Sequence, residues 1–229
     1  MDNLRRAVLA ANLKLAASGL APLTFGNVSG INRSAGRVVI KPSGVPYPDL
    51  TADNLAVVDL DGRHLSGGRP STDLLTHLAL YRAWPEIGGV AHTHSDAAVA
   101  FAQALRPIPC LGTTHADHFR GPVPVTWALT AEEVEADYEA ATGAAIVEAL
   151  TGRNPLHTPA ALVASHGPFT WGRDPAEAVQ NSVLLELVAR MALATYQLNP
   201  AAAEAPAHLQ DKHHQRKHGP GAYYGQEKK

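Results

Sequence analysis

Hydrophobic and polar residues follow two periods along this chain, and together they predict helices and strands in alternation. Apolar residues recur at helical spacing over residues 2–17, and Gly19 follows them as a stop signal. The same spacing predicts further helices at 72–83, 96–105, 131–150 and 175–198. Short apolar runs bounded by turn residues predict strands at 23–31, 37–40, 56–60, 88–93 and 161–164.

Several boundaries carry their own chemical signals. Ser71 or Thr72 is suited to cap the second helix, and Asp174 followed by a proline marks the start of the last one. Gly143 is the expected point of a break inside the helix at 131–150. The dipeptide at 61–62, Asp-Gly, predicts a hairpin between antiparallel strands. The chain is therefore expected to be α/β, with helices covering a partly antiparallel sheet.

Composition narrows the class of protein. With 45% hydrophobic and 17% charged residues, the chain can bury a core, and residues 1–229 are expected to form one domain. A net charge of −2 argues against a broad nucleic-acid or membrane partner. Cys110 is the only cysteine, which excludes a disulfide framework and a thiolate metal cluster. Neither a membrane-spanning run nor a targeting segment is evident, so we expect a cytoplasmic location.

The chain contains 12 histidines, and the sharpest chemical signal is His92-Thr93-His94. Residues two positions apart on a strand point to the same face, so both imidazoles can contact one divalent cation. The alternative interpretation is that these two polar residues merely end the strand and bind no metal. Because thiolates are lacking, a third ligand would have to supply nitrogen or oxygen.

Candidates for that ligand lie elsewhere in the chain. His166 follows an apolar run, and Asp73 lies in the first turn of a predicted helix, where a carboxylate also suits the helix dipole. His77, His115 and His118 compete for the same role, and periodicity alone leaves the choice open. Three histidines and a carboxylate suit zinc acting as a Lewis acid, with manganese or cobalt as substitutes.

Two segments have the composition of anion-binding loops. Lys-Pro-Ser-Gly at 41–44 follows a strand, and Arg-Pro-Ser-Thr at 69–72 opens a helix. Free N–H groups at a helix N-terminus favour an anion, and glycine permits close approach of the backbone. Ordinary turn and cap chemistry also explains either segment taken alone. Gly26-Asn27 is a weaker candidate, since a turn or a bulge accounts for it.

Six short motifs occur in a fixed order along the chain. They are Gly-Asn-Val-Ser (26–29), Lys-Pro-Ser-Gly (41–44), Pro-Ser-Thr-Asp (70–73), His-Thr-His-Ser (92–95), Gly-Thr-Thr-His-Ala-Asp (112–117) and Ser-His-Gly-Pro-Phe (165–169). In this order they resemble the class II aldolase/adducin family. The tail resembles the L-ribulose-5-phosphate 4-epimerases of that family through Asp-Lys-His (211–213), Arg-Lys-His-Gly (216–219) and Ala-Tyr-Tyr-Gly-Gln (222–226).

The resemblance implies a three-layer α/β/α sandwich around a mainly antiparallel sheet, assembled as a homotetramer with active sites between subunits. It implies a zinc-dependent enzyme that interconverts L-ribulose 5-phosphate and D-xylulose 5-phosphate by cleaving and re-forming the C3–C4 bond. The implied metal ligands are Asp73, His92, His94 and His166. The implied substrate- and phosphate-binding residues are Asn27, Lys41, Ser43, Gly44, Ser71 and Thr72, supported by Thr113, His213 and Arg216. Asp117 and Tyr224 map onto the acid/base pair, and residues 208–229 onto a tail that closes a neighbouring subunit's site.

The chain departs from the epimerase pattern at three places. His118 and His214 stand where aromatic residues are expected, and residues 227–229 add Glu-Lys-Lys. Because His118 neighbours Asp117, it could alter proton transfer. The basic tail is also compatible with a solvated extension or a nucleic-acid arm, but the tyrosine pair at 223–224 favours an ordered element that closes a site.

Other activities remain as alternatives. An aldolase of the same family, acting on L-fuculose- or L-rhamnulose-type phosphates, usually carries glutamate at the position of Asp73 and lacks this tail. A sugar-phosphate dehydratase would share the fold, as would a non-catalytic scaffold like adducin, which the retained histidines disfavour. An imine-forming aldolase needs a desolvated lysine, and Lys14 and Lys41 are the only lysines before the tail.

Overall fold

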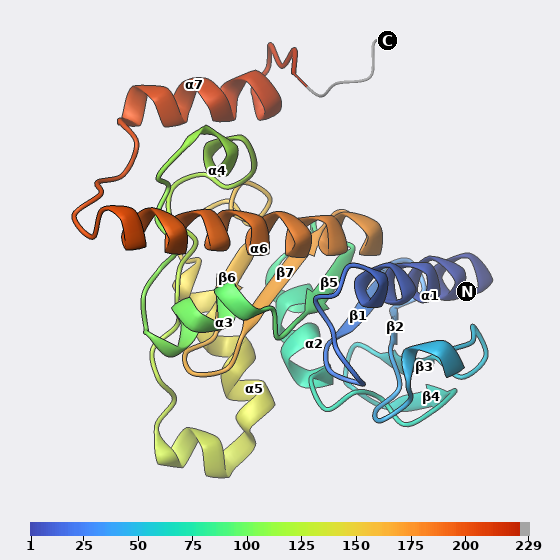
Figure 1. The fold of residues 1–229 in the computed structure, drawn as a ribbon. Coiled ribbons are helices and arrows are strands. Elements are labelled where there is room, and N and C mark those ends of the chain that lie inside the picture. The colour runs from blue at the N-terminus through green and yellow to red at the C-terminus, as the bar shows by residue number, and fades with distance from the viewer. Residues whose placement is uncertain (225–229) are drawn as a thin grey trace.

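The computed structural model describes residues 1–224, and these residues build one seven-stranded sheet (Figure 1). Across the sheet the strands follow the order β4-β3-β2-β1-β5-β7-β6, and every neighbouring pair is antiparallel. In chain order they are β1 (Asn27–Asn32), β2 (Arg37–Ile40), β3 (Ala56–Asp59), β4 (His64–Ser66), β5 (Gly89–His92), β6 (Ala160–Leu162) and β7 (Pro168–Gly172). The predicted hairpin at residues 61–62 is confirmed as the link between β3 and β4.

Helices cover both faces of the sheet and make three layers. Consecutive residues of a strand point to opposite faces, and β1 illustrates this. A Cβ added at Gly30 would lie 2.7 Å from Pro175 and 2.9 Å from Val8, whereas the Ser29 hydroxyl bonds to Tyr81 on the other face. One face carries α1 (Asp2–Ala17), α3 (Asp96–Gln103) and α6 (Pro175–Leu198), and the other carries α2 (Leu74–Ala83) and α5 (Ala131–Ala149). The expected α/β/α sandwich is thereby confirmed.

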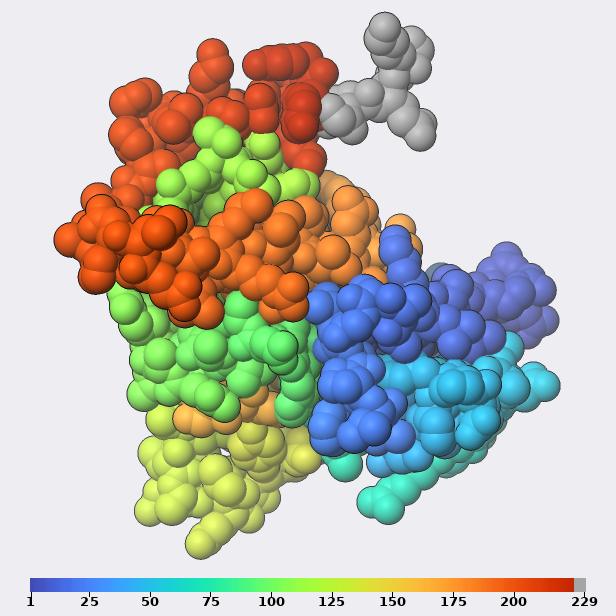
Figure 2. Space-filling model, viewed as in Figure 1, coloured from blue at the N-terminus to red at the C-terminus, as the bar shows by residue number. Residues whose placement is uncertain are grey.

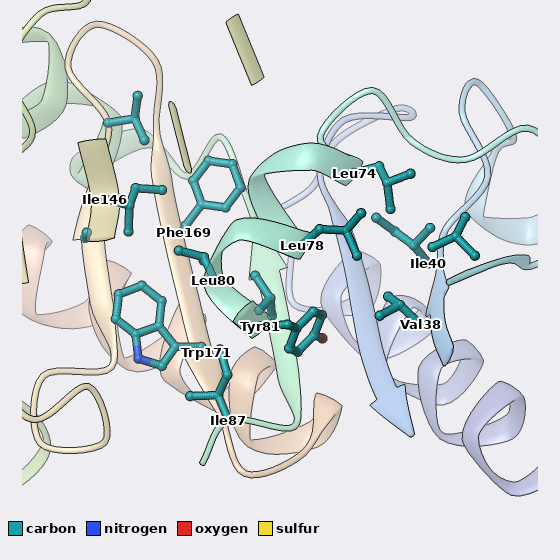
Figure 3. Close-up of a cluster of buried hydrophobic side chains, with 14 of the residues drawn as sticks. Val38, Ile40, Leu74, Leu78, Leu80, Tyr81, Ile87, Ile146, Phe169 and Trp171 are labelled. Carbon is teal, nitrogen blue, oxygen red and sulfur yellow. The ribbon is translucent and has the colours of Figure 1, made fainter. Parts of the chain in front are cut away.

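The largest hydrophobic cluster fills the space between the sheet and the helices α2 and α5 (Figure 3). Trp171 of β7, Ile40 of β2 and Leu78 of α2 meet there, and all three are fully buried. Burial of a large apolar side chain contributes about 1.5–3 kcal/mol, whereas an exposed ion pair contributes roughly 0–1 kcal/mol. The buried core therefore contributes far more to the stability of this fold than the surface ion pairs do.

A carboxylate from α6 holds the turn that follows β5. Glu186 is 3% exposed, and its two oxygens accept the backbone N–H groups of Ala97 and Ala98 at 3.1 Å. These N–H groups lie in the first turn of α3, where a helix offers them no partner of its own. Arg190 bonds to the same carboxylate at 2.7 Å. The contact fixes the chain just beyond the strand that carries the predicted metal ligands.

The structure corrects two expected helix features. α2 begins at Leu74, so Asp73 is the N-cap residue and not part of the first turn, and its side chain caps no N–H group. The prediction of a break in α5 at Gly143 was wrong, because the helix breaks at Asp137 (φ −171°, ψ 96°). Gly143 instead allows close packing on α2, since a Cβ there would lie 2.5 Å from the Cβ of Ala79.

Two strand expectations also need correction. The chain before Asn27 forms turns and coil, not the start of a strand at residue 23. Leu23 has a φ of 57°, which is incompatible with extended strand pairing. Strand β7 was not predicted, because its pattern, Pro-Phe-Thr-Trp-Gly, is short and has a proline and a glycine at its ends. A three-residue 3₁₀ helix, η1 (Tyr47–Asp49), completes the elements of the first third.

The tail contains a helix that its polar pattern did not predict. α7 (Ala207–His218) packs against the short helix α4 (Thr113–His118) at one end of the molecule (Figure 1), and Figure 2 shows the contact from the same side. α7 has no apolar stripe, and the side chain it buries is His214. Pro206 before it and Gly219 after it are the boundary signals that the sequence offers. The added Glu-Lys-Lys lies outside the described residues.

Among the helices of residues 1–224, none combines the length and apolar character that crossing a bilayer requires.

Candidate metal and substrate site

Strand pairing brings three of the predicted metal ligands together. His92 ends β5, His94 follows two residues later, and His166 lies in the turn between β6 and β7. β7 pairs with β5 so that Phe169 lies opposite His92, which carries the turn with His166 to the same edge of the sheet. The Nε2 atoms of His92 and His94 are 3.0 Å apart, and one nitrogen from each of the three rings lies within 4.8 Å of the others.

All three imidazoles are held in the neutral form that binds a metal. Burial lowers the pKa of His92 to about 3, and burial also lowers the pKa of His94 and of His166. The Nδ1–H of His92 donates to the backbone oxygen of Pro168 at 3.0 Å, which leaves Nε2 with the lone pair. Metal-binding histidines are commonly oriented by such an outer hydrogen bond. The donor set therefore fits a divalent metal such as zinc.

Asp73 lines the same region, and its carboxylate is held by a neighbouring amide. Asn27 Nδ2 donates to Asp73 Oδ2 at 2.5 Å, and the Ser71 hydroxyl lies 3.5 Å from the same oxygen. Burial alone would raise the pKa of Asp73, but the imidazoles of His92 and His77 and the Asn27 amide outweigh it, so the pKa is lowered. The close set of ligand atoms among residues 1–224 consists of the three histidines, and a fourth ligand role for Asp73 stays a prediction.

The three histidines, His92, His94 and His166, are called the metal group. They border a cavity of about 350 Å³, the metal cavity, which the two predicted anion-binding loops also line. The loops lie side by side because the Ser43 N–H donates to Arg69 O at 2.8 Å and the Ser71 N–H donates to Lys41 O at 3.1 Å. The predicted site residues that line it are Asn27, Lys41, Ser43, Gly44, Ser71, Thr72, Asp73, His92, His94 and His166. Segments from separate regions of the chain thus share one cavity.

Lys41 gives this cavity a buried positive charge. Its side chain is 2% exposed, and its ammonium lies 3.3 Å from the carbonyl oxygen of Thr24 and 4.9 Å from the centre of the Tyr47 ring. Burial lowers the pKa of Lys41. No carboxylate within residues 1–224 forms an ion pair with it. A buried ammonium without a counter-ion is costly, and a substrate anion in the cavity would relieve that cost.

Two further residues that line the cavity were not predicted. Thr24 and Phe25 lie in the turn before β1, and the Phe25 ring stacks on His94 with the ring centres 5.6 Å apart. Gly26 makes this turn possible, because its φ is 73° and a Cβ there would lie 2.7 Å from the backbone oxygen of His92. The local sequence offers no signal for Phe25, since only the completed fold brings it to the metal group.

The competing histidines do not line the cavity. His77 is fully buried in α2, and its Nδ1 lies 2.7 Å from the Ser29 hydroxyl. The Nε2–H of His115 donates to a backbone oxygen at 2.8 Å. His118 faces the ammonium of Lys217 at 3.2 Å, and burial followed by that charge lowers the pKa of His118 to about 4. In the described part of the chain, His166 is therefore the histidine that joins the predicted pair.

The predicted acid/base residues form a second group between α4 and α7. The Asp117 carboxylate accepts two hydrogen bonds from Arg216, at 2.9 and 2.6 Å, and lies 3.2 Å from Nδ1 of His213. The Arg216 guanidinium lies 4.2 Å from the centre of the Tyr224 ring. Thr113 begins α4 and lines another cavity, against α6. None of these five residues lines the metal cavity of the same chain.

The contacts of Asp117 determine its charge. Burial alone would raise the pKa of Asp117, but the hydrogen bonds and charges of Arg216 and His213 outweigh it and lower the pKa. The carboxylate is therefore ionised, and it is a weak base for as long as Arg216 holds both of its oxygens.

His214 is the buried anchor of α7, and its titration should make the protein sensitive to acid. It is 3% exposed, and neither ring nitrogen has a partner within residues 1–224. Burial, and then the neighbouring His218, His157 and Arg120, lower the pKa of His214 to about 4, although Asp211 opposes them. The unfolded chain takes up this proton near a pH of about 6.5. The free energy of unfolding should therefore fall as the pH falls from that value towards 4.

We expect His214→Phe to reduce this loss of stability. Phenylalanine keeps a ring at the site, removes the proton uptake and leaves no buried nitrogen unpaired. Urea unfolding at about pH 7 and about pH 5 measures the difference. His208→Phe, at an exposed position of the same helix, is the matched control and should lose as much stability as the parent protein. An equal loss in His214→Phe would contradict the assignment.

Comparisons with known proteins give a consistent result. The family profile described as "Class II Aldolase and Adducin N-terminal domain" matches residues 6–193. Curated relatives named L-ribulose-5-phosphate 4-epimerase UlaF, from Salmonella paratyphi C (strain RKS4594) and Salmonella typhi, are 52% identical over 227 residues. The match covers 99% of this chain and 100% of each relative.

Solved structures share the fold. An L-fuculose 1-phosphate aldolase superimposes with a TM-score of 0.80 at 22% identity, over 94% of this chain and 96% of that chain. The L-fuculose-1-phosphate aldolase from Thermus Thermophilus gives a TM-score of 0.68 at 27% identity, over 86% of this chain and 97% of that chain.

Proposed function

The chain belongs to the class II aldolase and adducin family, and from this premise we propose that it is an L-ribulose-5-phosphate 4-epimerase. The reaction interconverts L-ribulose 5-phosphate and D-xylulose 5-phosphate by breaking and re-forming the C3–C4 bond. The observation that carries the proposal is one cavity that holds three neutral histidines and a buried lysine. A ketose phosphate needs a metal-binding end and an anion-binding end in one cavity. The full-length similarity to epimerases supports this choice within the family.

A divalent metal fits the residues present, and we propose zinc, with manganese or cobalt as substitutes. His92, His94 and His166 would hold it, with Asp73 as a fourth ligand. When bound, the metal supplies a Lewis acid that neutralises negative charge developing on the substrate oxygens. Asp73 also orients Asn27, whose Oδ1 is buried and has no partner within residues 1–224. That oxygen is suited to accept a hydrogen bond from a substrate hydroxyl.

The phosphate of the substrate is proposed to bind at the other end of the cavity. Lys41 would supply the charge, and the hydroxyls of Ser43, Ser71 and Thr72 would supply donors. Gly44 has a φ of 71° and open space where a Cβ would be, so the backbone can approach the anion closely. Backbone hydrogen bonds hold the two loops together. The loops would therefore form a stable binding site that keeps the phosphate bound while the C3–C4 bond is broken.

Proton transfer is proposed to use Asp117 and Tyr224, one on each face of the aldehyde that forms. These residues do not line the metal cavity of their own chain, so we propose that α4 and the tail of a neighbouring subunit supply them in a homotetramer. Residues 208–229 would form the closing tail, and the part beyond Tyr224 lies outside the described residues. The single cysteine and the composition favour a cytoplasmic enzyme.

The rival activities have weaker support. The likeness to the L-fuculose 1-phosphate aldolase at 22% identity concerns the fold and does not favour an aldolase activity. A non-catalytic scaffold would not require three neutral imidazoles beside a buried lysine, so this arrangement argues against the scaffold alternative.

The test is a coupled assay for conversion of L-ribulose 5-phosphate to D-xylulose 5-phosphate, with and without a chelator. We expect turnover that the chelator abolishes and added zinc restores. Failure of the fully metal-loaded protein would overturn the proposal. Release of free dihydroxyacetone phosphate from L-fuculose 1-phosphate would then identify the aldolase instead.

A further inference from the structure

The three metal-site imidazoles are oriented in different ways. His92 donates from Nδ1 to the backbone of Pro168, which lies at the start of β7. His94 stacks against Phe25. His166 lies in a tight turn next to Ser165, whose φ of 58° is unusual for serine. The ring of His166 is bonded at Nδ1 to the hydroxyl of a residue from α5, Tyr138, at 3.0 Å.

The break in α5 delivers this tyrosine to the site. At Asp137 the backbone leaves the helical conformation, and the Asp137 carboxylate accepts the N–H of Ala140 at 3.0 Å, as the N-cap of a new helix does. Tyr138 is thus the first residue of the second helical piece. In an unbroken helix its direction would be fixed by the preceding turns, since each residue rotates the side chain by about 100°.

Two contacts with α2 hold this second piece in position. The Thr76 hydroxyl donates to the backbone oxygen of Glu139 at 2.7 Å. Gly143, one turn further on, allows α5 to pack closely on Ala79. The residue next to Tyr138 is therefore anchored to α2, the helix whose N-cap is Asp73, the proposed fourth ligand.

We infer that Tyr138 is a positioning residue for the metal, acting by holding the imidazole of His166. Tyr138 does not line the cavity, and its hydroxyl contacts the proposed ligand His166 instead. With Nδ1–H of His166 donated to the Tyr138 oxygen, Nε2 keeps its lone pair for the metal. Without that oxygen, the ring can rotate about the turn and its Nδ1–H loses its partner. The inference rests on the proposed metal site.

Tyr138→Phe tests the inference through metal affinity. We expect the dissociation constant for Zn²⁺ to rise roughly 10–100-fold, the usual effect of losing an outer hydrogen bond to a ligand. It is measured on metal-stripped protein by competition with a chromogenic chelator. Tyr196→Phe, at a half-buried tyrosine of α6 packed against Arg106, is the matched control and should leave the constant unchanged. The visible spectrum of the Co²⁺-loaded protein should also change in Tyr138→Phe alone.

A second pair of variants separates positioning from a general loss of structure. Asp137→Ala removes the cap that starts the second helical piece and should weaken Zn²⁺ binding, whereas Asp137→Asn keeps a good cap and should restore it. Unchanged Zn²⁺ affinity and an unchanged Co²⁺ spectrum in Tyr138→Phe would overturn the inference, and so would equal affinities for Asp137→Ala and Asp137→Asn.

The same metal titrations distinguish failure of the inference on Tyr138 from failure of the proposed function. If the parent protein binds no Zn²⁺, or if His166→Asn binds it as tightly as the parent, the proposed metal site falls and the inference falls with it. If the parent binds Zn²⁺ and catalyses epimerisation while Tyr138→Phe matches it in affinity and spectrum, only the inference on Tyr138 is overturned.

Discussion

Replacement of His92 by asparagine is expected to abolish tight metal binding and to lower epimerase turnover by roughly 10³-fold, equivalent to about 4 kcal/mol of transition-state stabilisation. His92 is central to the group, because its ring lies 4.8 Å from that of His94 and 4.7 Å from that of His166. Asparagine cannot place a nitrogen at the position of Nε2. Metal content after dialysis and initial rates in the coupled assay measure the two effects.

The control for this prediction must separate metal loss from unfolding. His92 is buried and bonds to Pro168, so its replacement also removes a structural contact. His94→Asn is the companion variant. Because the His94 ring is only half-buried, its removal should disturb the fold less than removal of the His92 ring. His64→Asn, at an exposed strand edge, should retain metal and turnover. Full activity in a metal-free His94→Asn protein would contradict the metal-dependent mechanism.

Tyr224→Phe is expected to lower turnover by roughly 10²–10⁴-fold, the range that a positioned acid/base group contributes. Metal affinity should not change, because Tyr224 is not one of the residues proposed to hold the metal. The substitution removes only the hydroxyl, so the packing of the ring on the Arg216 guanidinium is retained. Tyr223→Phe is the matched control, since Tyr223 is the neighbouring residue and is 71% exposed. Similar rates for the two variants would refute the acid/base role.

Mixing inactive variants tests where the second group comes from. If each site combines the histidines of one subunit with Tyr224 of its neighbour, hybrids of His94→Asn and Tyr224→Phe chains contain some intact sites. Dissociating the two proteins together and reassembling them should then restore part of the activity. If the mixture stays inactive after exchange of subunits has been verified, the intersubunit arrangement is contradicted.

The geometry of Asp117 adds a condition on its role. In the described conformation Arg216 binds both carboxylate oxygens and His213 lies close to one of them. An ionised carboxylate in this state is a poor proton acceptor. Asp117 can therefore accept a proton only when Arg216 shifts. Because Arg216 lies in α7, the helix that precedes Tyr224, proton uptake by Asp117 would require a movement in that helix or in the Arg216 side chain.

Local patterns were sufficient where a segment's own periodicity reflects its surroundings. The helices at 2–17 and 175–198 were predicted closely, because each carries apolar residues at helical spacing, some of which are buried against the sheet. His92 and His94 were paired from the sequence by alternation on a strand, and their rings do lie together, although β5 ends at His92 and His94 lies just beyond it. The residue types of the loop at 41–44 predicted an anion site; the structure places the loop at the cavity, and its anion role stays a prediction. Roles for His166, Asp117 and Tyr224 came from the resemblance, and those roles stay predictions.

Only the tertiary structure decided which distant segments meet. His166 reaches His92 because β7 pairs with β5, and the two anion-binding loops lie together because Ser43 and Lys41 exchange backbone hydrogen bonds with the segment at 69–71. Tyr138 reaches His166 through a break in α5 whose one local signal was the capping aspartate, Asp137. The polar helix α7 had no apolar stripe to predict it. Periodicity records that a face is buried, whereas long-range pairing and packing determine what buries it.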